Sequence, residues 1–298
     1  MSFTRCIQDY VRYIRENKEL SPSTVENYDY ELRRLQDFFA QKNTPLVPGK
    51  VTSRHIGQYL GWLKEERGYK PASIKRVSSV IRSFFNYLIW TGGEGVRENP
   101  TLTLPSVKTQ KKLPQVLSAA ESRQFITGIK KVSSFPSRDY AMFLLFLHAC
   151  LRLQELQQLK LDSIHLQEGY MEIGGLGRAR RVPLSPEACR GLSEYMEIRR
   201  HQGGTDALFL TPQGKPVTKS GISCLFKSLA RKTGVYKPGL SVQKLRHTGL
   251  ALKLQEGLDM GELQEFAGHA SSSTTHIYRR VVEMQKSRQY SASVGEGR

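Results

Sequence analysis

The C-terminal third of the chain reads Ser241-Val-Gln-Lys-Leu-Arg-His-Thr248, continues through an apolar-periodic stretch, and then reads Glu265-Phe-Ala-Gly-His-Ala-Ser-Ser-Ser-Thr-Thr-His-Ile-Tyr278. Arg246 is predicted to open a helix, and His269 follows a glycine, which adopts a left-handed backbone conformation readily. Tyr278 follows a Ser/Thr run that can cap a short helix. An arginine, a histidine and a tyrosine are thus predicted to meet a negatively charged partner.

A second stretch upstream, His148-Ala-Cys-Leu-Arg152-Leu-Gln-Glu155-Leu156, combines an arginine with a glutamate. The segment 139–149 before it is nearly all apolar and is predicted to be a buried helix that delivers Arg152. A further helix is predicted to begin there, and Glu155 lies three residues on, so the two side chains can share one face. Taken alone, this spacing fits a structural ion pair as well as a functional site.

The two stretches resemble the tyrosine recombinase (phage integrase) family, whose pattern runs A-x-G-L-R-x-x-E-L, then H-x-L-R-H, then L-G-H, then T-T-x-x-Y. The pieces occur here in that order, over most of the chain. The resemblance implies site-specific DNA recombination by transesterification through a 3′-phosphotyrosyl intermediate, with Tyr278 as the nucleophile. It implies Arg152 and Arg246 as clamps on the phosphate, His269 as a donor to it, and Glu155 as the residue that holds Arg152 in place. It implies no cofactor and no metal.

These residue types suit the cleavage of a phosphodiester without a metal. The arginine side chain is planar, donates bidentately to phosphate oxygens and stays charged at any working pH. Such preorganised donors stabilise the charge that builds up in the transition state. A tyrosine phenol titrates near about pH 10, so its attack at neutral pH requires positive surroundings or a base.

The chain departs from the family pattern at three places. Gln243 stands where the family has its first histidine, and glutamine cannot accept a proton. Leu176 stands where the family has the hairpin lysine that protonates the leaving oxygen. Arg178 or Arg180 could approach that oxygen, although arginine is a poor acid. Cys150 replaces a glycine at the bend before the first arginine, where a left-handed conformation costs a non-glycine residue about 1 kcal/mol.

These departures leave three functions open. The first is a recombinase, compact and similar to the Xer or transposon-type members, since the chain begins directly with a helical unit. The second is a catalytically impaired, recombinase-like DNA-binding or architectural protein. The third is an enzyme that relaxes supercoiled DNA, similar to a type IB topoisomerase. Formation of a covalent adduct separates the first from the second, and strand exchange between two sites separates the first from the third.

The composition points to a polyanionic partner. Lys and Arg number 45 against 27 Asp and Glu, which gives a net charge of +18 and favours nucleic acid. Basic residues outnumber acidic ones both before and after Pro100, as expected if two domains bind one DNA duplex from opposite sides. The four cysteines are scattered without metal-ligand spacing, and the N-terminus lacks the apolar core of a signal peptide. The sequence therefore predicts a cytoplasmic, nucleoid-associated protein with no metal and no membrane segment.

Apolar residues recur at helical spacing through the first part of the chain and predict four helices, over 3–14, 22–41, 53–67 and from Pro71 onward. Polar residues on the fourth helix form a candidate DNA surface, with a solvated helix face as the alternative: Lys75, Arg76, Ser79 and Arg82. The start of the second helix adds further donors to phosphate: Ser23, Thr24 and Asn27.

The second part is predicted to be α-rich with two short strands around a Gly-rich turn at 171–184. Further DNA contacts are expected from basic residues there and in the linker: Lys111, Lys112, Arg180, Arg181 and Lys244. The predicted fold is mainly α, with a four-helix SAM-like core-binding domain at 1–95, a linker at 96–116, and a catalytic domain with a small antiparallel β-sheet at 117–298. The expected partners are double-stranded DNA with inverted-repeat sites and further copies of the chain, as a tetramer on paired sites.

Overall fold

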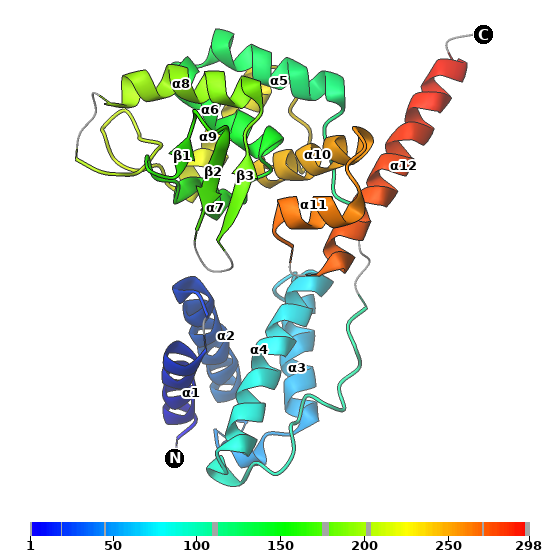
Figure 1. The fold of residues 1–298 in the computed structure, drawn as a ribbon. Helices are drawn as coiled ribbons and strands as arrows, with labels where there is room; N and C mark the ends of the chain where they lie inside the picture. Colours follow the sequence, from blue (N-terminus) through cyan, green and yellow to red (C-terminus); the bar gives the residue numbers. More distant parts are fainter. Residues whose placement is uncertain are drawn as a thin grey trace. The chain divides into compact units, whose positions relative to one another are not determined.

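The computed structural model describes the following residues: 2–18, 20–44, 46–108, 113–174, 179–200, 204–269 and 271–295. The chain divides into two compact units, Met1–Lys111 and Lys112–Arg298. Figure 1 shows the helices and strands of each unit. Several residues singled out from the sequence lie outside the described residues: Lys111, Lys112, Leu176 and Arg178.

The first unit contains the four helices that the sequence predicts. They are α1 (Phe3–Asn17), α2 (Pro22–Gln41), α3 (Ser53–Glu65) and α4 (Pro71–Trp90), with two short 3₁₀ helices, η1 (Pro48–Lys50) and η2 (Gly93–Gly95). Prolines at the first position start both α2 and α4, where their fixed φ suits a helix and their missing N–H is not needed. Ser21 caps α2 by accepting a hydrogen bond from the backbone N–H of Thr24.

Aromatic rings fill the core of the first unit. Phe3 of α1 lies against Phe84 of α4, with ring centroids 5.7 Å apart, and both side chains are fully buried. Phe38 of α2 packs on Tyr59 of α3 at 5.3 Å. Because large aromatic side chains bury much apolar surface, these contacts fix the apolar faces of all four helices inward and leave the polar faces to solvent.

The second unit is built around a buried helix. Its helices are α5 (Ala119–Val132), α6 (Pro136–His148), α7 (Leu153–Gln157), α8 (Pro186–Arg200), α9 (Lys219–Lys232), α10 (Val242–Gln255), α11 (Met260–Ala267) and α12 (Ser272–Gly295). The continuous apolar segment at 141–147 is buried on every side, because α5, α8 and α10 all pack against α6 (Figure 1). A helix that is apolar all round is the kind that forms the centre of a core.

A three-stranded antiparallel sheet accompanies these helices. Its strands are β1 (Ile164–His165), β2 (Tyr170–Ile173) and β3 (Arg180–Pro183), in the order β1-β2-β3. Met171 pairs with Val182 and both are buried, whereas the next pair, Glu172 and Arg181, faces solvent. The two strands predicted from the sequence are therefore present, and β1 is an addition.

Two predicted helix boundaries are wrong. Helix α10 begins at Val242 and not at Arg246, because Val242 and Leu245 are themselves buried core residues of its first turn. The helix that carries Tyr278 is not short: α12 continues to Gly295, since its sequence has no glycine or proline that could break it before then. Val281, one turn beyond the tyrosine, is buried within its own unit.

None of the helices in the described part of the chain is both long and apolar enough to cross a membrane.

Candidate active site

The corner between α6 and α7 positions Arg152. The chain turns there through Cys150, whose φ of 50° lies in the left-handed region that a glycine would adopt more easily. Helix α10 approaches this corner very closely at Gly249, where an added Cβ would lie 2.0 Å from the carbonyl oxygen of Leu147. This close approach brings Arg246 of α10 next to the corner.

Arg246 links three parts of the site. Its side chain is 4% exposed, and its terminal nitrogens donate to the carbonyl oxygen of Cys150 and, at 2.6 Å, to that of Ala267 at the end of α11. One of them also lies 3.1 Å from Nε2 of His269. Burial, and then the neighbouring Arg152, lowers the pKa of Arg246, although an arginine remains charged in such a site. A fixed positive charge is therefore held beside the histidine.

Glu155 accepts hydrogen bonds from two arginines. Its carboxylate accepts from the backbone N–H of Arg152 at 2.7 Å and from the side chain of Arg152 at 2.6 Å. Both terminal nitrogens of Arg180 also donate to it, at 2.8 and 3.1 Å, and Arg246 lies 3.9 Å away. Burial raises the pKa of Glu155, but the bonds from Arg180 and from Arg152 outweigh it and bring the pKa to about 2. The carboxylate is therefore ionised and holds three arginines together.

Arg180, for which the sequence predicts a DNA contact, lies in this cluster and donates to Glu155. Its side chain is 16% exposed, and its buried Nε has no hydrogen-bond partner among the described residues. Gly268 permits the approach, because a Cβ there would lie 3.1 Å from Cζ of Arg180, and its φ of 61° is left-handed as expected. Its carbonyl oxygen also accepts from Arg152 at 2.5 Å.

His269 stacks on Tyr278. The two rings are nearly parallel, with an angle of 5° and centroids 6.2 Å apart. Because Arg246 is always a donor, Nε2 of His269 accepts from it, and Nδ1 then carries the proton and donates to Oγ1 of Thr275 at 3.1 Å. Burial, followed by the charges of Arg246 and Arg152, lowers the pKa of His269 to about 4, so the ring is neutral at pH 7.

The hydroxyl of Tyr278 is buried and lies 2.7 Å from Nδ1 of His247. Burial raises the pKa of Tyr278 to about 12, while Arg246 and Arg152 act in the opposite direction. The two arginines are therefore near enough to favour the phenolate. His247 was not among the predicted site residues, although it is the final histidine of the H-x-L-R-H pattern, which was the signal available.

The remaining predicted residues of the second unit lie around this cluster. Gln243 is exposed on the first turn of α10, and Lys244 beside it is half-buried. Arg181 is exposed on β3, where its Nε lies 3.2 Å from Glu172 and its guanidinium lies over the ring of Tyr170. These basic groups are outside the hydrogen-bonded cluster.

The predicted DNA residues of the first unit occupy the N-terminal turns of α2 and the exposed side of α4. Lys75 and Ser79 are exposed. Arg76 is already engaged with Asn27 and, at 2.7 Å, with the buried carboxylate of Glu31. Two others are bonded within the unit, since Arg82 donates to Thr101 and Thr24 is bonded to Ser21, while Ser23 is exposed.

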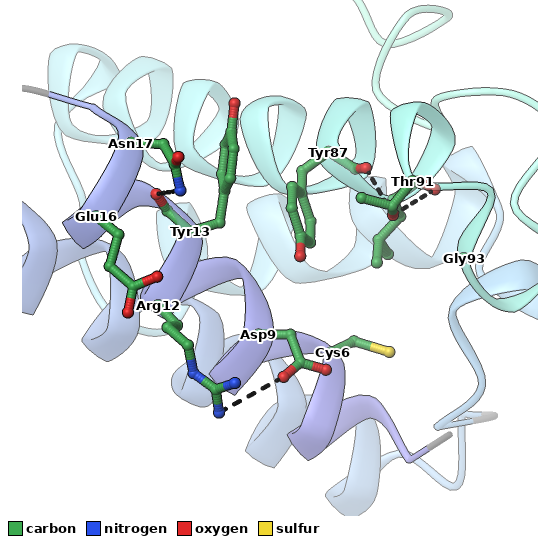
Figure 2. Close-up of a pocket in the computed structure, with 10 residues that line it drawn as sticks. Cys6, Asp9, Arg12, Tyr13, Glu16, Asn17, Tyr87, Thr91 and Gly93 are labelled. Carbon is green, nitrogen blue, oxygen red and sulfur yellow. Dashed lines mark hydrogen bonds and ion pairs between the residues drawn. The ribbon is translucent and has the colours of Figure 1, made fainter.

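A cavity of about 390 Å³ lies in the first unit between α1 and α4. Figure 2 shows Asp9 and Glu16 of α1 beside Tyr13 and Tyr87, with Arg12 paired to Asp9 at 3.9 Å. Two carboxylates against one guanidinium disfavour phosphate, so we do not expect this cavity to bind DNA.

Two family models match the chain. The model of the phage integrase family matches residues 110–284, and that of the phage integrase N-terminal SAM-like domain matches residues 7–92. The chain belongs to the phage integrase family. It is an enzyme of site-specific DNA recombination, a tyrosine recombinase with a SAM-like helical domain in its N-terminal part.

Relatives of this integrase-family chain are similar over nearly their whole length. The tyrosine recombinase XerC of Natranaerobius thermophilus is 31% identical, over 95% of this chain and 96% of the relative. The tyrosine recombinase XerD of Listeria innocua serovar 6a is 29% identical, over 94% and 95%.

Solved structures of integrases and recombinases have the same fold. The integrase of transposon Tn1549 in complex with circular intermediate DNA has a TM-score of 0.77 at 18% identity, covering 93% of this chain and 95% of that one. The XerH site-specific recombinase bound to a palindromic substrate has a TM-score of 0.74 at 20% identity, covering 99% and 96%.

Proposed function

We propose that Tyr278 is the nucleophile with which this recombinase cuts and rejoins DNA. The observation that carries the proposal is that the Tyr278 ring stacks on His269, which contacts Arg246, and that the charges of Arg246 and Arg152 act on the phenol. In this reaction the phenol oxygen attacks the scissile phosphorus, the bond from phosphorus to the 5′ oxygen breaks, and a 3′-phosphotyrosyl link forms. That link conserves the energy of the broken bond, so religation to another strand needs no external energy source.

Arg152 and Arg246 act as the phosphate clamp in this proposal. Arg152 has 39% of its side chain exposed, so it can reach a phosphate while keeping its bond to Glu155. Arg246 is buried beside it, and its contact with His269 would be exchanged for one with the phosphate. Charges held in fixed positions stabilise the developing negative charge without reorganisation, typically by several kcal/mol.

His269 is the third group that we propose to contact the phosphate, as a hydrogen-bond donor. Its Nε2 accepts from Arg246 in the free enzyme, so donation to a phosphate oxygen requires the other tautomer or a proton on this nitrogen. A phosphate that binds Arg246 would supply the acceptor and release Nε2 for that role. Gln243, exposed on the first turn of α10, can add a hydrogen bond but not a base.

This chain has no lysine at the position in the β2–β3 hairpin from which the family protonates the leaving 5′ oxygen. Leu176 occupies that position in the sequence. We propose that Arg178, two residues further along the chain, stabilises the negative charge of the leaving oxygen. Arg180, bonded twice to Glu155, serves instead to orient the carboxylate that holds Arg152.

We propose double-stranded DNA with inverted-repeat sites as the substrate, bound by a tetramer on paired sites. Residues 1–95 would act as the core-binding domain and 117–298 as the catalytic domain, joined by a linker at 96–116. The exposed Lys75 and Ser79 on α4, the overall charge of +18, and the palindromic DNA in the XerH structure support this proposal. Such a substrate places the protein in the cytoplasm, at the nucleoid.

The test is a covalent adduct on DNA. Duplexes that the protein selects from a random library are prepared with a nick beside the cleavage position, so that a cut strand is lost and the adduct accumulates. The full chain is expected to give a denaturant-stable adduct, and Tyr278→Phe is expected to give none while binding DNA with unchanged affinity, since it lacks one hydroxyl only. An adduct that persists in Tyr278→Phe would exclude Tyr278 as the nucleophile.

A further inference from the structure

We propose that His247 is the general base that takes the proton of the Tyr278 hydroxyl when its oxygen attacks the phosphorus. The inference rests on the proposed role of Tyr278 as nucleophile and adds a catalytic residue to it. Neither the arginines nor His269 provides this function, because each is already committed elsewhere in the cluster.

The geometry suits a direct proton transfer. Nδ1 of His247 lies 2.7 Å from the Tyr278 oxygen, within the distance expected of a base and the proton it abstracts. The ring centroids are 5.8 Å apart at an angle of 39°. Among the residues that the structure describes, His247 is the hydrogen-bond partner of this hydroxyl. The tyrosine is thus held by the group that can deprotonate it.

Burial, aided by the neighbouring positive charges, keeps His247 neutral and available as a base. Burial lowers the pKa of His247 to about 4, with Lys244 and Arg246 acting in the same direction. The groups that face it are these two residues of its own helix, His269 after α11 and Tyr278 of α12. The imidazole is therefore neutral at pH 7, and the lone pair on Nδ1 can accept the phenol proton.

The other candidates for this base are unsuitable. Gln243 has no basic atom. His269 has Nε2 occupied by Arg246 and Nδ1 by Thr275. Both carboxylate oxygens of Glu155 are bonded to Arg152 and Arg180, and the hydrogen bond of the Tyr278 hydroxyl goes to His247 instead. In a chain with glutamine at position 243, His247 is the group left in contact with the reacting oxygen.

The proton balance of the step is complete. As the bond between phosphorus and the Tyr278 oxygen forms, the phenol proton moves to Nδ1 of His247, and the departing 5′ oxygen takes a proton from water. In religation the incoming 5′ hydroxyl attacks the phosphorus and gives up its proton to water. The bond to Tyr278 then breaks, and the imidazolium of His247 returns its proton to the tyrosine.

The experiment compares His247→Gln with His276→Gln as the matched control. His276 lies on α12 two residues before the nucleophile and is exposed. Adduct formation is followed on the selected nicked duplex between about pH 6 and about pH 9. Loss of a general base is expected to slow adduct formation about a hundredfold or more in His247→Gln, and His276→Gln is expected to match the unmodified protein.

The pH dependence separates a base from a structural residue. With His247 present, the rate is expected to be nearly flat over this range, because the base is neutral throughout. In His247→Gln only the ionised phenol reacts, so the rate is expected to rise about tenfold per pH unit. His247→Ala is expected to regain rate when imidazole is added, which a purely structural role would not allow.

The outcomes distinguish the two proposals. A rate and a pH profile in His247→Gln equal to those of the unmodified protein, with the adduct still lost in Tyr278→Phe, would overturn the role of His247 and leave the nucleophile intact. A slow His247→Gln with the unmodified pH profile, together with no imidazole rescue of His247→Ala, would also overturn it. An adduct in Tyr278→Phe would instead overturn the assignment of the nucleophile.

Discussion

Arg180 donates from both of its terminal nitrogens to the two carboxylate oxygens of Glu155, at 2.8 and 3.1 Å. The carboxylate also accepts hydrogen bonds from the backbone N–H and from the side chain of Arg152. One negative charge therefore offsets a concentration of positive charge that would otherwise repel itself in a partly buried site. We expect the stability of the second unit, and the proposed contact of Arg152 with a phosphate, to depend on this carboxylate.

Glu155→Gln is expected to lower the free energy of unfolding by about 3 kcal/mol at pH 7, because it leaves clustered arginines without their counter-charge. The measurement is urea unfolding of the full chain. Glu172→Gln is the control, since that carboxylate is 49% exposed and pairs with Arg181 only at the surface. It is expected to change the free energy by less than about 1 kcal/mol. Equal losses in the two variants would contradict the central role of Glu155.

The contribution of Glu155 to the free energy of unfolding is expected to decrease at acid pH. The pKa of Glu155 is about 2 in the folded chain, against an ordinary value of 4.5 for a glutamate, so the folded state binds its proton less readily than the unfolded chain. The stabilisation is therefore present above about pH 4.5 and is lost as the pH falls toward about 2. The difference in unfolding free energy between the unmodified protein and Glu155→Gln is expected to shrink across that window. A difference that stayed constant would show that the charge of Glu155 is not what stabilises the fold.

The fold followed from local sequence signals to a large extent. Prolines at the first helical position and apolar residues at helical spacing mark α2 and α4 correctly. Strand β1 was missed, because it has only two residues and no periodicity can be read from it. The start of α10 was misplaced because Arg246, a buried arginine, looks like a boundary in a sequence but lies in the second helical turn.

The site was predictable only in part. The resemblance pointed to Arg152, Arg246, His269 and Tyr278, and the structure brings these four together. His247 could not be assigned from spacing, since its contact with the tyrosine joins α10 to α12 across 31 residues. The position of Arg180 against Glu155 likewise depends on how the hairpin folds back on α7, which the strand pattern does not encode.

Gly249→Ala tests the close packing of α10 on the α6–α7 corner. A Cβ there would lie 2.0 Å from the backbone oxygen of Leu147, so backbone must move, and the variant is expected to lose about 3 kcal/mol of stability. Gly61→Ala is the matched control, because Gly61 is inside α3 with nothing within 4 Å of its added Cβ. It is expected to gain about 0.5–1 kcal/mol through helix propensity. Thermal or urea unfolding measures both, and a loss in Gly61→Ala as large as in Gly249→Ala would contradict the packing argument.

Lys75→Gln tests the proposed DNA surface of α4. Removal of one phosphate contact is expected to weaken binding to all DNA sequences alike and to reduce the slope of log affinity against log salt by about 0.9. Fluorescence anisotropy at several salt concentrations measures the slope. Arg12→Gln removes a charge of the same sign from the cavity side of α1, where it is paired with Asp9. Its slope is expected to be unchanged, and an equal effect of both variants would indicate net charge rather than a contact surface.

A substrate whose leaving 5′ oxygen is replaced by sulfur distinguishes deprotonation of the attacking oxygen from protonation of the leaving oxygen. Sulfur leaves without being protonated, and Leu176 provides no proton donor, so the unmodified protein is expected to form adduct about a hundredfold faster on this duplex than on the oxygen duplex. His247→Gln is expected to accelerate by a similar factor and to remain slower than the unmodified protein, because His247 serves the attacking oxygen and not the leaving one. Leu176→Lys, by contrast, is expected to accelerate cleavage of the oxygen duplex and to have little effect on the sulfur duplex. If sulfur restored His247→Gln to the rate of the unmodified protein, His247 would be acting on the leaving group, and the proton transfer from Tyr278 would have to be assigned to another residue.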